Sequence, residues 1–213
     1  MVDFNRVKVE VEDGVAVLTL NHPEVMNAIS VDMLEGLIEA FDFIEDRDNG
    51  VRCVVMTGAG KGFCAGANLQ GRNTSTSKKT NAGSVLESHY HPLLRRMRRL
   101  HCPMLTAING AAAGAGMSLS LMGDLKLASR SAYFLQAFRR IGLVPDAGST
   151  WMLPRLVGTA RAMELSLLGE KLPAEKALEW GLINRVYDDA ELMGEAKKMA
   201  KELAALRFLA WWI

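Results

Sequence analysis

The sequence of 213 residues has little cysteine, few aromatic residues and almost no excess of either charge. Its 25 Lys and Arg residues nearly balance its 24 Asp and Glu residues, so the formal net charge is +1. Such a balance argues against a protein that binds nucleic acid or an acidic membrane surface mainly by charge. We therefore expect neither nucleic acid nor a membrane as its main partner.

The three cysteines cannot all pair within the chain, and each lies beside apolar or small residues. Unpaired cysteines are typical of a reducing compartment. The first ten residues carry charges where a signal peptide has its apolar region. The longest apolar runs also fall short of the roughly 18 residues that a membrane span needs. We expect a cytoplasmic chain without a transmembrane segment.

Hydrophobic residues make up 49% of the chain and charged residues 23%, which is enough apolar material for a sizeable core. Alternating residues at 7–12, the Asp13-Gly14 turn and an apolar run at 15–20 predict a β-hairpin. Ser30 is placed to cap a helix whose apolar stripe runs through Ile44. Further strands are expected at 51–57, 104–108, 125–128 and 133–137.

The later part of the chain is predicted to be mostly helical, after a strand-rich first part. Helical spacing is found at 85–101, 150–156, 159–168, 174–180 and 188–206. Between two core-type segments, residues 71–84 are polar and are predicted to form a mobile loop. This order predicts an α/β or α+β fold, with a core domain over 1–155 and a helical C-terminal region over 156–213.

Three segments combine glycine and alanine with turn residues in a way that packing alone does not require, at 62–68, 109–116 and 142–148. Small residues let a ligand or another backbone approach main-chain N–H groups closely. A glycine-rich turn from a strand into a helix also presents free N–H donors. Two such turns side by side would form an oxyanion hole.

Asp146 is the one acid of the third segment and lies between Pro145 and Ala147. An acid that faces an apolar pocket has a raised pKa, which suits it to proton transfer. The alternative is that Asp146 caps a helix over 147–152. The spacing alone leaves both interpretations open.

Several other site types are excluded by their spacing. Gly58-Ala-Gly-Lys-Gly lacks the spacing and the final Ser or Thr of a phosphate loop. The turn that begins at Gly114 lacks the third glycine of a dinucleotide fingerprint. His89, His91 and His101 lack the companions of a closed zinc site. We therefore expect no metal and no nucleotide cofactor.

Five motifs make the chain resemble the crotonase (enoyl-CoA hydratase/isomerase) superfamily, from near the N-terminus to about Asp189. They are Pro23-x-x-x-Asn27-Ala28, Phe63-Cys-Ala-Gly66, Asn109-Gly-x-Ala-x-Gly-x-Gly116, Gly158-x-x-x-Ala162 and Ala177-x-x-x-Gly181-Leu182. Within the superfamily, residues 141–146 are similar to the 1,2-epoxyphenylacetyl-CoA isomerases of phenylacetate degradation and to related enoyl-CoA isomerases.

The resemblance implies a spiral of ββα turns and a C-terminal helical region that assembles a homotrimer or a hexamer. The chain is shorter than usual members, so this region is expected to be truncated. The resemblance implies an acyl-CoA substrate whose carbonyl oxygen binds the backbone N–H groups of Ala67 and Ala115. No separate cofactor is implied, because coenzyme A is part of the substrate. The implied substrate and CoA contacts are Val25, Met26, Ala28, Ala65, Gly66, Asn68, Leu69 and Gly114.

Departures from the family pattern favour an isomerase. The two glutamates with which hydratases add water correspond here to Ser118 and Phe138, and neither is an acid. Asp146 falls where isomerase-like members place a single acid, which is enough to move a proton along an enolate. Two alternatives stay open: a hydratase or hydrolase in which Asp146 activates water, and a catalytically weak acyl-CoA-binding assembly protein. Residues 206–213 do not resemble the usual C-terminal helices.

Overall fold

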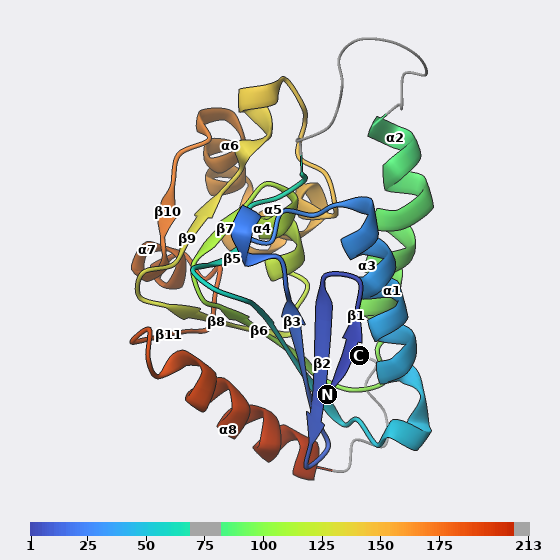
Figure 1. Ribbon diagram of the computed structural model, residues 1–213. Coiled ribbons are helices and arrows are strands. Elements are labelled where there is room, and N and C mark those ends of the chain that lie inside the picture. The colour runs from blue at the N-terminus through green and yellow to red at the C-terminus, as the bar shows by residue number, and fades with distance from the viewer. Residues whose placement is uncertain (69–81, 207–213) are drawn as a thin grey trace.

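The computed structural model describes residues 1–68 and 82–206, which form two sheets surrounded by helices (Figure 1). The larger sheet has the order β1 (Val2–Phe4), β2 (Val7–Glu12), β3 (Val15–Leu20), β4 (Cys53–Gly58), β6 (Met104–Ile108), β8 (Leu125–Ser129) and β11 (Arg185–Tyr187). The smaller sheet has the order β10 (Leu172–Pro173), β9 (Tyr133–Leu135), β7 (Ala111–Ala113) and β5 (Gly62–Cys64). The expected hairpin is confirmed, with Val11 opposite Ala16 in antiparallel register.

The chain alternates between the two sheets and thereby forms a spiral. Strands β4, β6 and β8 are parallel neighbours in the larger sheet, and each is followed in the chain by β5, β7 or β9 in the smaller sheet. The α/β spiral that the resemblance implies is therefore confirmed. Strand β5 was not expected, because three small or buried residues carry no alternating pattern.

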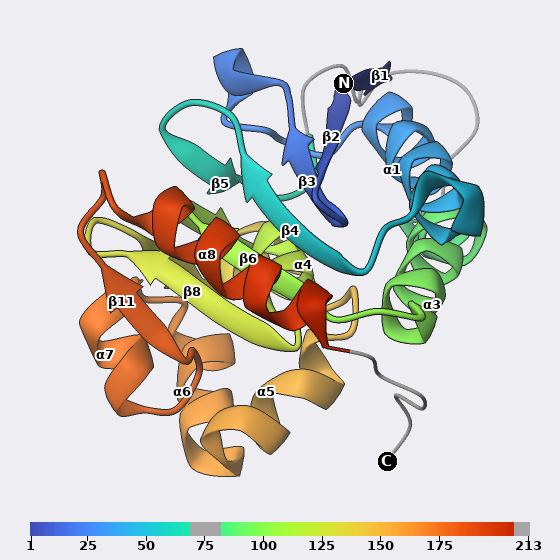
Figure 2. The same ribbon diagram turned by 90° about the horizontal axis from the view of Figure 1, so that it is seen from below.

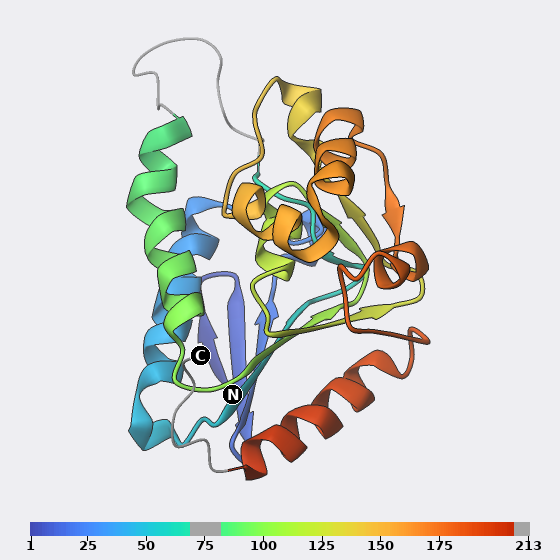
Figure 3. The ribbon, with the colours of Figure 1, turned by 180° about the vertical axis from the view of Figure 1, so that it is seen from behind.

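One face of the larger sheet is covered by helices from the first half of the chain. Helix α1 (Val31–Glu45) begins where expected, and the Ser30 hydroxyl accepts a hydrogen bond from the Met33 amide at 3.3 Å. Helix α3 (His91–Arg99) packs beside α1 (Figure 3). The single helix expected over 85–101 is instead divided into α2 (Ala82–Val85), a π-helical turn (Leu86–Tyr90) and α3. Helix α2 also begins inside the loop expected at 71–84, most of which lies outside the described residues.

The opposite face of the larger sheet is covered by α8 (Leu192–Ala205), as Figure 2 shows. Its buried residues follow one another at intervals of four, which places them on one side of the helix. Three of the four are alanines, so the helix approaches the sheet closely. They form a second core cluster with residues of β3, β4, β6 and β8: Val15, Cys53, Val55, Leu105, Ala107 and Leu127.

The remaining helices are α4 (Ala115–Ser120), α5 (Ser149–Val157), α6 (Thr159–Leu168) and α7 (Ala174–Glu179). Their buried side chains belong to the same main core as the β2–β3 hairpin, and this core extends from Val7 to Ile183. The division expected near residue 155 stays a prediction. Within the described ranges, none of the helices is long and apolar enough to cross a lipid bilayer.

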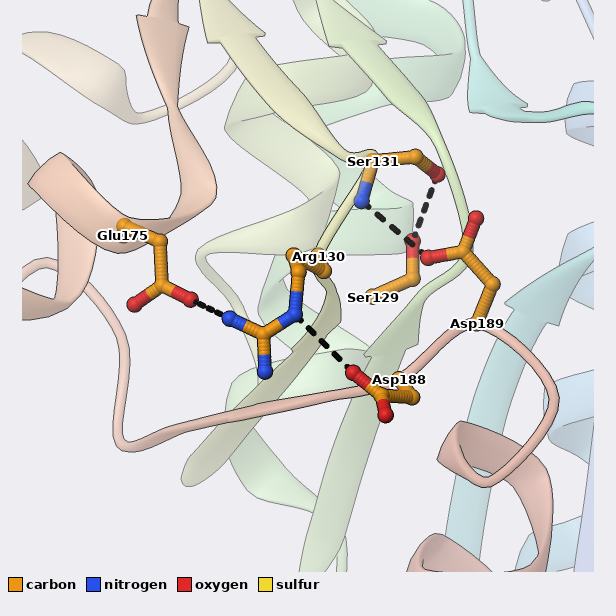
Figure 4. A network of polar contacts seen from close by, with 6 residues as sticks. All are labelled: Ser129, Arg130, Ser131, Glu175, Asp188 and Asp189. Carbon is orange, nitrogen blue, oxygen red and sulfur yellow. Dashed lines mark hydrogen bonds and ion pairs between the residues drawn. The ribbon is translucent and has the colours of Figure 1, made fainter.

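A polar network fastens the later segments to the β8–β9 turn (Figure 4). Arg130 pairs with Glu175 of α7, and its Nε donates to Asp188 at 2.9 Å. The Ser131 amide donates to the Asp189 carboxylate at 3.1 Å. All three acids come from the helical part of the chain, so this turn links that part to the spiral.

Candidate active site

The three parallel strands of the smaller sheet end at one cavity of about 460 Å³. Residues 65–68 follow β5, Gly114 and Ala115 follow β7, and Ala137 and Phe138 come shortly after β9. The carboxyl ends of parallel strands are where α/β proteins bind ligands, because the connecting loops gather there. The start of α1, the α2–α3 segment and residues 140–146 complete the cavity wall.

The turn after β5 is shaped by Gly66, whose φ of +93° favours glycine. The Ile29 amide donates to the Gly66 carbonyl at 2.7 Å, and the Asn68 amide donates to the Ile29 carbonyl at 2.8 Å. These two bonds hold the turn against the residues that precede α1. Among the backbone bonds of the described residues, none uses the amide of Ala67, which lies between the two bonded residues.

The turn after β7 leads directly into α4. Gly114 has φ +51° and ψ −126°, and its amide donates to the Leu135 carbonyl of β9 at 2.8 Å. Ala115 is the first residue of α4, where an amide has no acceptor within its own helix. A Cβ on Gly116 would lie 2.3 Å from the Cys64 carbonyl oxygen, so glycine is required for α4 to approach β5 this closely.

The two turns lie against each other. A Cβ built on Gly66 would be 2.7 Å from the Ala113 carbonyl oxygen and 3.5 Å from the Ala115 nitrogen. A side chain at position 66 would therefore separate the turns. The predicted pair Ala67 and Ala115 is thus brought to one cavity by two adjacent small-residue segments.

Two asparagines of the family-like motifs fix the backbone beneath this site. Asn27 is fully buried, and its amide nitrogen donates to the carbonyls of Ala59 and Gly62 at 2.9 Å each. The Asn109 side chain accepts from the Gly58 amide at 3.2 Å and donates to the Gly60 carbonyl at 3.0 Å. Both side chains therefore hold residues 58–62, which lead into β5.

Asp146 lines the same cavity and does not cap a helix. Helix α5 begins at Ser149 behind Gly148, so the capping interpretation is wrong. The chain turns away from a helical path after Asp146, because Ala147 and Gly148 have φ values of +49° and +86°. The Oδ1 atom of Asp146 is buried and has no hydrogen-bond partner among the described residues. Burial raises the pKa of Asp146 above its ordinary value of 3.8, although the charge of His91 acts in the opposite direction.

Phe138 and Ser118, the positions at which the resemblance implies hydratase glutamates, make other contacts here. Phe138 lies on the cavity wall and is 6% exposed. Ser118 is fully buried in α4, and its hydroxyl donates to the carbonyl oxygen of Asp146 at 3.0 Å. Position 118 therefore contacts the backbone of the acidic residue.

Some predicted binding residues lie outside the cavity wall. Ala65, Gly66, Asn68 and Gly114 line it, whereas Val25, Met26 and Ala28 do not. Met26 is half exposed, and its carbonyl accepts from the Ala65 amide at 2.9 Å, so this segment lies beside the turn after β5. The role of these three residues in binding CoA stays a prediction. Leu69 lies outside the described residues.

Part of the apolar wall comes from residues that carry no site signal in the sequence. Leu86 and Tyr90 reach the cavity from the π-helical turn, and Leu143 reaches it from the segment that precedes Asp146. A π-helical turn shifts the side chains that follow it, so regular helical spacing gives no signal for them. Such turns occur often at functional sites, and this one supplies Leu86 and Tyr90 to the cavity wall.

Within residues 1–68 and 82–206, no group of three or more His, Cys, Asp or Glu side chains is placed to hold a metal ion. The sulfhydryl groups of Cys53, Cys64 and Cys102 are free and buried, and burial raises the pKa of each to about 12. Thiols with so high a pKa carry little thiolate at neutral pH. Among the described residues that line the cavity, Asp146 is the one carboxylic acid.

Known proteins with similar sequences and structures point to one family. 1,2-Epoxyphenylacetyl-CoA isomerase from Escherichia coli (strain K12) is 49% identical over 195 residues, which cover 91% of this chain and 74% of that protein. 4-Chlorobenzoyl coenzyme A dehalogenase-2 from Arthrobacter sp is 37% identical over 94% of this chain and 73% of its own length.

The crystal structure of an enoyl-CoA hydratase from Bacillus anthracis matches with a TM-score of 0.86 and 33% identity, over 94% of this chain and 77% of that one. The profile of the enoyl-CoA hydratase/isomerase family matches residues 10–210, almost the whole chain. Sequence, fold and the motifs around the cavity agree. The chain is an enzyme of the enoyl-CoA hydratase/isomerase family.

Proposed function

We propose that this protein is an acyl-CoA isomerase in which Asp146 moves a proton and two backbone amides stabilise a thioester enolate. The proposal is carried by the Oδ1 atom of Asp146, which is buried at the cavity lined by Ala67 and Ala115 and has no hydrogen-bond partner within the part of the chain that the structure describes. A buried polar atom without a partner is uncommon in a folded protein and calls for an explanation. A substrate bound in the cavity would be the missing partner of Oδ1.

The proposed oxyanion hole consists of the amides of Ala67 and Ala115. Its support is that the two turns are adjacent and that Ala115 begins a helix, where its amide lacks an internal acceptor. Donors that the fold already holds in position stabilise a developing negative charge without reorganising. Both donors are backbone amides, so the side chains at positions 67 and 115 are not needed for donation. Because both residues are alanine, their small side chains leave room for the thioester.

For a 3-enoyl-CoA, the Asp146 carboxylate takes a proton from C2, and the electrons of that bond move toward the carbonyl oxygen. The resulting dienolate oxygen accepts hydrogen bonds from the two amides. Protonated Asp146 then returns the proton to C4, and the double bond comes into conjugation with the thioester. The raised pKa of Asp146 brings it nearer to the working pH, which favours both transfers. No cofactor is consumed.

Two substrate classes fit this scheme: 3-enoyl-CoA thioesters and ring-epoxidised phenylacetyl-CoA, which would expand to an oxepin. The second class is supported by the name of the relative that is 49% identical. The CoA portion is proposed to lie near Val25, Met26 and Ala28. Hydration is disfavoured because Ser118 and Phe138 offer no second acid beside the cavity.

We propose a homotrimer or a hexamer as the assembled form, in the cytoplasm. Large apolar side chains on α5 and α6 support self-association, because half or more of each is exposed: Trp151, Met163, Leu167 and Leu168.

The deciding experiment replaces Asp146 with Asn in the full chain. Asp146→Asn is expected to keep the fold and the affinity for CoA thioesters but to lower turnover of a 3-enoyl-CoA by about 10² to 10⁴. Turnover is followed by the absorbance of the conjugated thioester, and proton removal by solvent deuterium exchange at C2. A fully active Asn variant would contradict the proposal. Mass spectrometry separates isomerisation from hydration, because only hydration adds a water to the product.

A further inference from the structure

We propose that Ser118 is a positioning residue whose hydroxyl fixes the Asp146 loop on α4, so that the carboxyl group faces the cavity. The inference rests on the proposed function of Asp146 and adds a specific device to it. The loop is defined here as residues 142–148. Ser118 itself touches no substrate in this scheme, because it is fully buried and is not among the residues that line the cavity.

The Ser118 hydroxyl contacts both halves of the proposed site. Its Oγ lies 3.0 Å from the carbonyl oxygen of Asp146 and 3.4 Å from that of Gly114. A serine hydroxyl has one proton to donate, and the shorter contact is the better hydrogen bond. Gly114 immediately precedes Ala115, whose amide is a proposed oxyanion donor. The Ser118 side chain therefore contacts both the turn that carries this donor and the acidic residue.

The backbone of Asp146 is fixed by two donors. Besides Ser118, the amide of Ser149 donates to the Asp146 carbonyl at 3.0 Å. Within the described residues, by contrast, Oδ1 of the same residue has no partner. The orientation of the carboxyl group therefore depends on where the backbone is held.

The loop needs such a tether because its own conformation opposes this arrangement. Ala147 has a φ of +49°, a left-handed conformation that is unfavourable for alanine and persists only where surrounding structure imposes it. On the other side of Asp146, Val144 is 78% exposed and Leu143 is 41% exposed, so packing restrains that part of the loop weakly. Without the hydroxyl of Ser118, we expect the loop to relax and the acid to move toward solvent.

The test compares two serines of the same short helix. Ser120 is also fully buried, but its hydroxyl donates at 2.7 Å to the Met117 carbonyl within α4, and among the described residues it makes no hydrogen bond to the loop. Ser118→Ala and Ser120→Ala therefore remove the same atoms from the same helix. Ser118→Ala is expected to lower kcat by about tenfold to a hundredfold with KM little changed, since small misplacements of a reacting group are costly. In Ser120→Ala, kcat is expected to stay within about twofold of the wild-type value, because the position of Asp146 is unchanged.

A titration tests the position of the acid directly. The carboxyl signal of Asp146, assigned by its absence in Asp146→Asn, is followed by NMR against pH. In Ser118→Ala its pKa should fall toward the ordinary value, because a displaced acid is less buried. Ser118→Cys, with a similar size and a weaker donor, should lie between the wild type and the Ala variant and remains informative if Ala at this position does not fold.

Failure of this inference and failure of the proposed function give different results. If Asp146→Asn abolishes turnover while Ser118→Ala keeps wild-type kcat and the wild-type titration, the positioning role is wrong and the proposed function stands. Equal losses in Ser118→Ala and Ser120→Ala would also overturn it, since they would reflect the stability of α4. If Asp146→Asn stays active, the proposed function and the positioning role both fail.

Discussion

The turns after β5 and β7, which carry the amides of Ala67 and Ala115, meet the Asp146 loop at one cavity. The turns and the loop are held in different ways. The turns are closed by backbone contacts that leave no room for a Cβ on Gly66 or Gly116, and the side chains of Asn27 and Asn109 support the segment that leads into β5. The loop has exposed apolar residues and a strained Ala147, and its acidic residue is fixed by the Ser118 hydroxyl and the Ser149 amide.

This difference fits the tasks proposed for the two regions. An oxyanion donor must keep its position while charge develops, so rigidity is what makes it effective. A proton-transfer acid must approach two carbon atoms in turn and needs a tuned pKa, which depends on how deeply the loop is buried. Close backbone contacts therefore hold the donors, whereas the acid is held by the buried Ala147 beside it and by two hydrogen bonds to its carbonyl oxygen.

Among variants of the two turns, the largest effect is expected from removing a backbone N–H donor. Ala115 is the first residue of α4, a position where the fixed φ of proline fits a helix, and the substitution removes the amide hydrogen while adding ring carbons at a buried position. Ala115→Pro should lower turnover by about 10² to 10³ with the fold retained. Ala67→Pro should act in the same direction, with added strain in the turn.

Steady-state kinetics on 3-enoyl-CoA measures both losses. Ala67→Gly and Ala115→Gly keep the amides and should retain most activity. If both proline variants were as active as the wild type, the proposed oxyanion hole would be refuted.

A smaller effect, on stability, is expected from crowding the turns. Gly116→Ala would place a Cβ 2.3 Å from the Cys64 carbonyl oxygen, so the free energy of unfolding should fall by about 3 kcal/mol. Gly194 of α8 has open space around it, and Gly194→Ala should raise the same quantity by about 0.5 to 1 kcal/mol through helix propensity. Urea unfolding of both variants measures the contrast. Equal small changes would mean that the turns are less tightly packed than described.

The smallest effect concerns the pH dependence of stability through Asp146. Its pKa is raised by burial in the folded protein, so the folded state binds this proton more tightly than the unfolded state does. The cost of the buried charge is fully present above the folded pKa and disappears as the pH falls toward the ordinary value of 3.8. Asp146→Asn lacks this cost and should be more stable than the wild type near neutral pH.

The stability advantage of Asp146→Asn should shrink as the pH is lowered, which urea unfolding at about pH 7 and about pH 4 can measure. An advantage that stayed constant or grew in acid would contradict the burial of Asp146. Ser118→Ala, compared with its own Asp146→Asn double variant, should show a smaller advantage, since a displaced acid is less buried.

Local patterns in the sequence were enough to predict much of the fold. The alternation at 7–12 and the turn at Asp13-Gly14 predicted the hairpin, and the spacing behind Ser30 predicted α1. Residues 104–108 were predicted as a strand with the bounds that β6 has. Strand β2 and helix α1 are buried on one side, which a repeating pattern of apolar residues predicts, whereas β6 is buried at every position and is predicted by its continuous apolar run. The glycines of the turns could also be identified from the sequence, because a residue without a side chain is recognised from its identity alone.

Only the tertiary structure decided between the two interpretations of Asp146. A helix cap and a cavity-facing acid look alike in sequence, because the distinction depends on the left-handed conformation of Ala147 and Gly148 and on what surrounds the carboxyl group. The contact from Ser118 joins positions 28 residues apart, and the wall residues on the π-helical turn break regular spacing. Sequence patterns determine which residues are buried or form turns, whereas the partner that each of them meets depends on long-range packing.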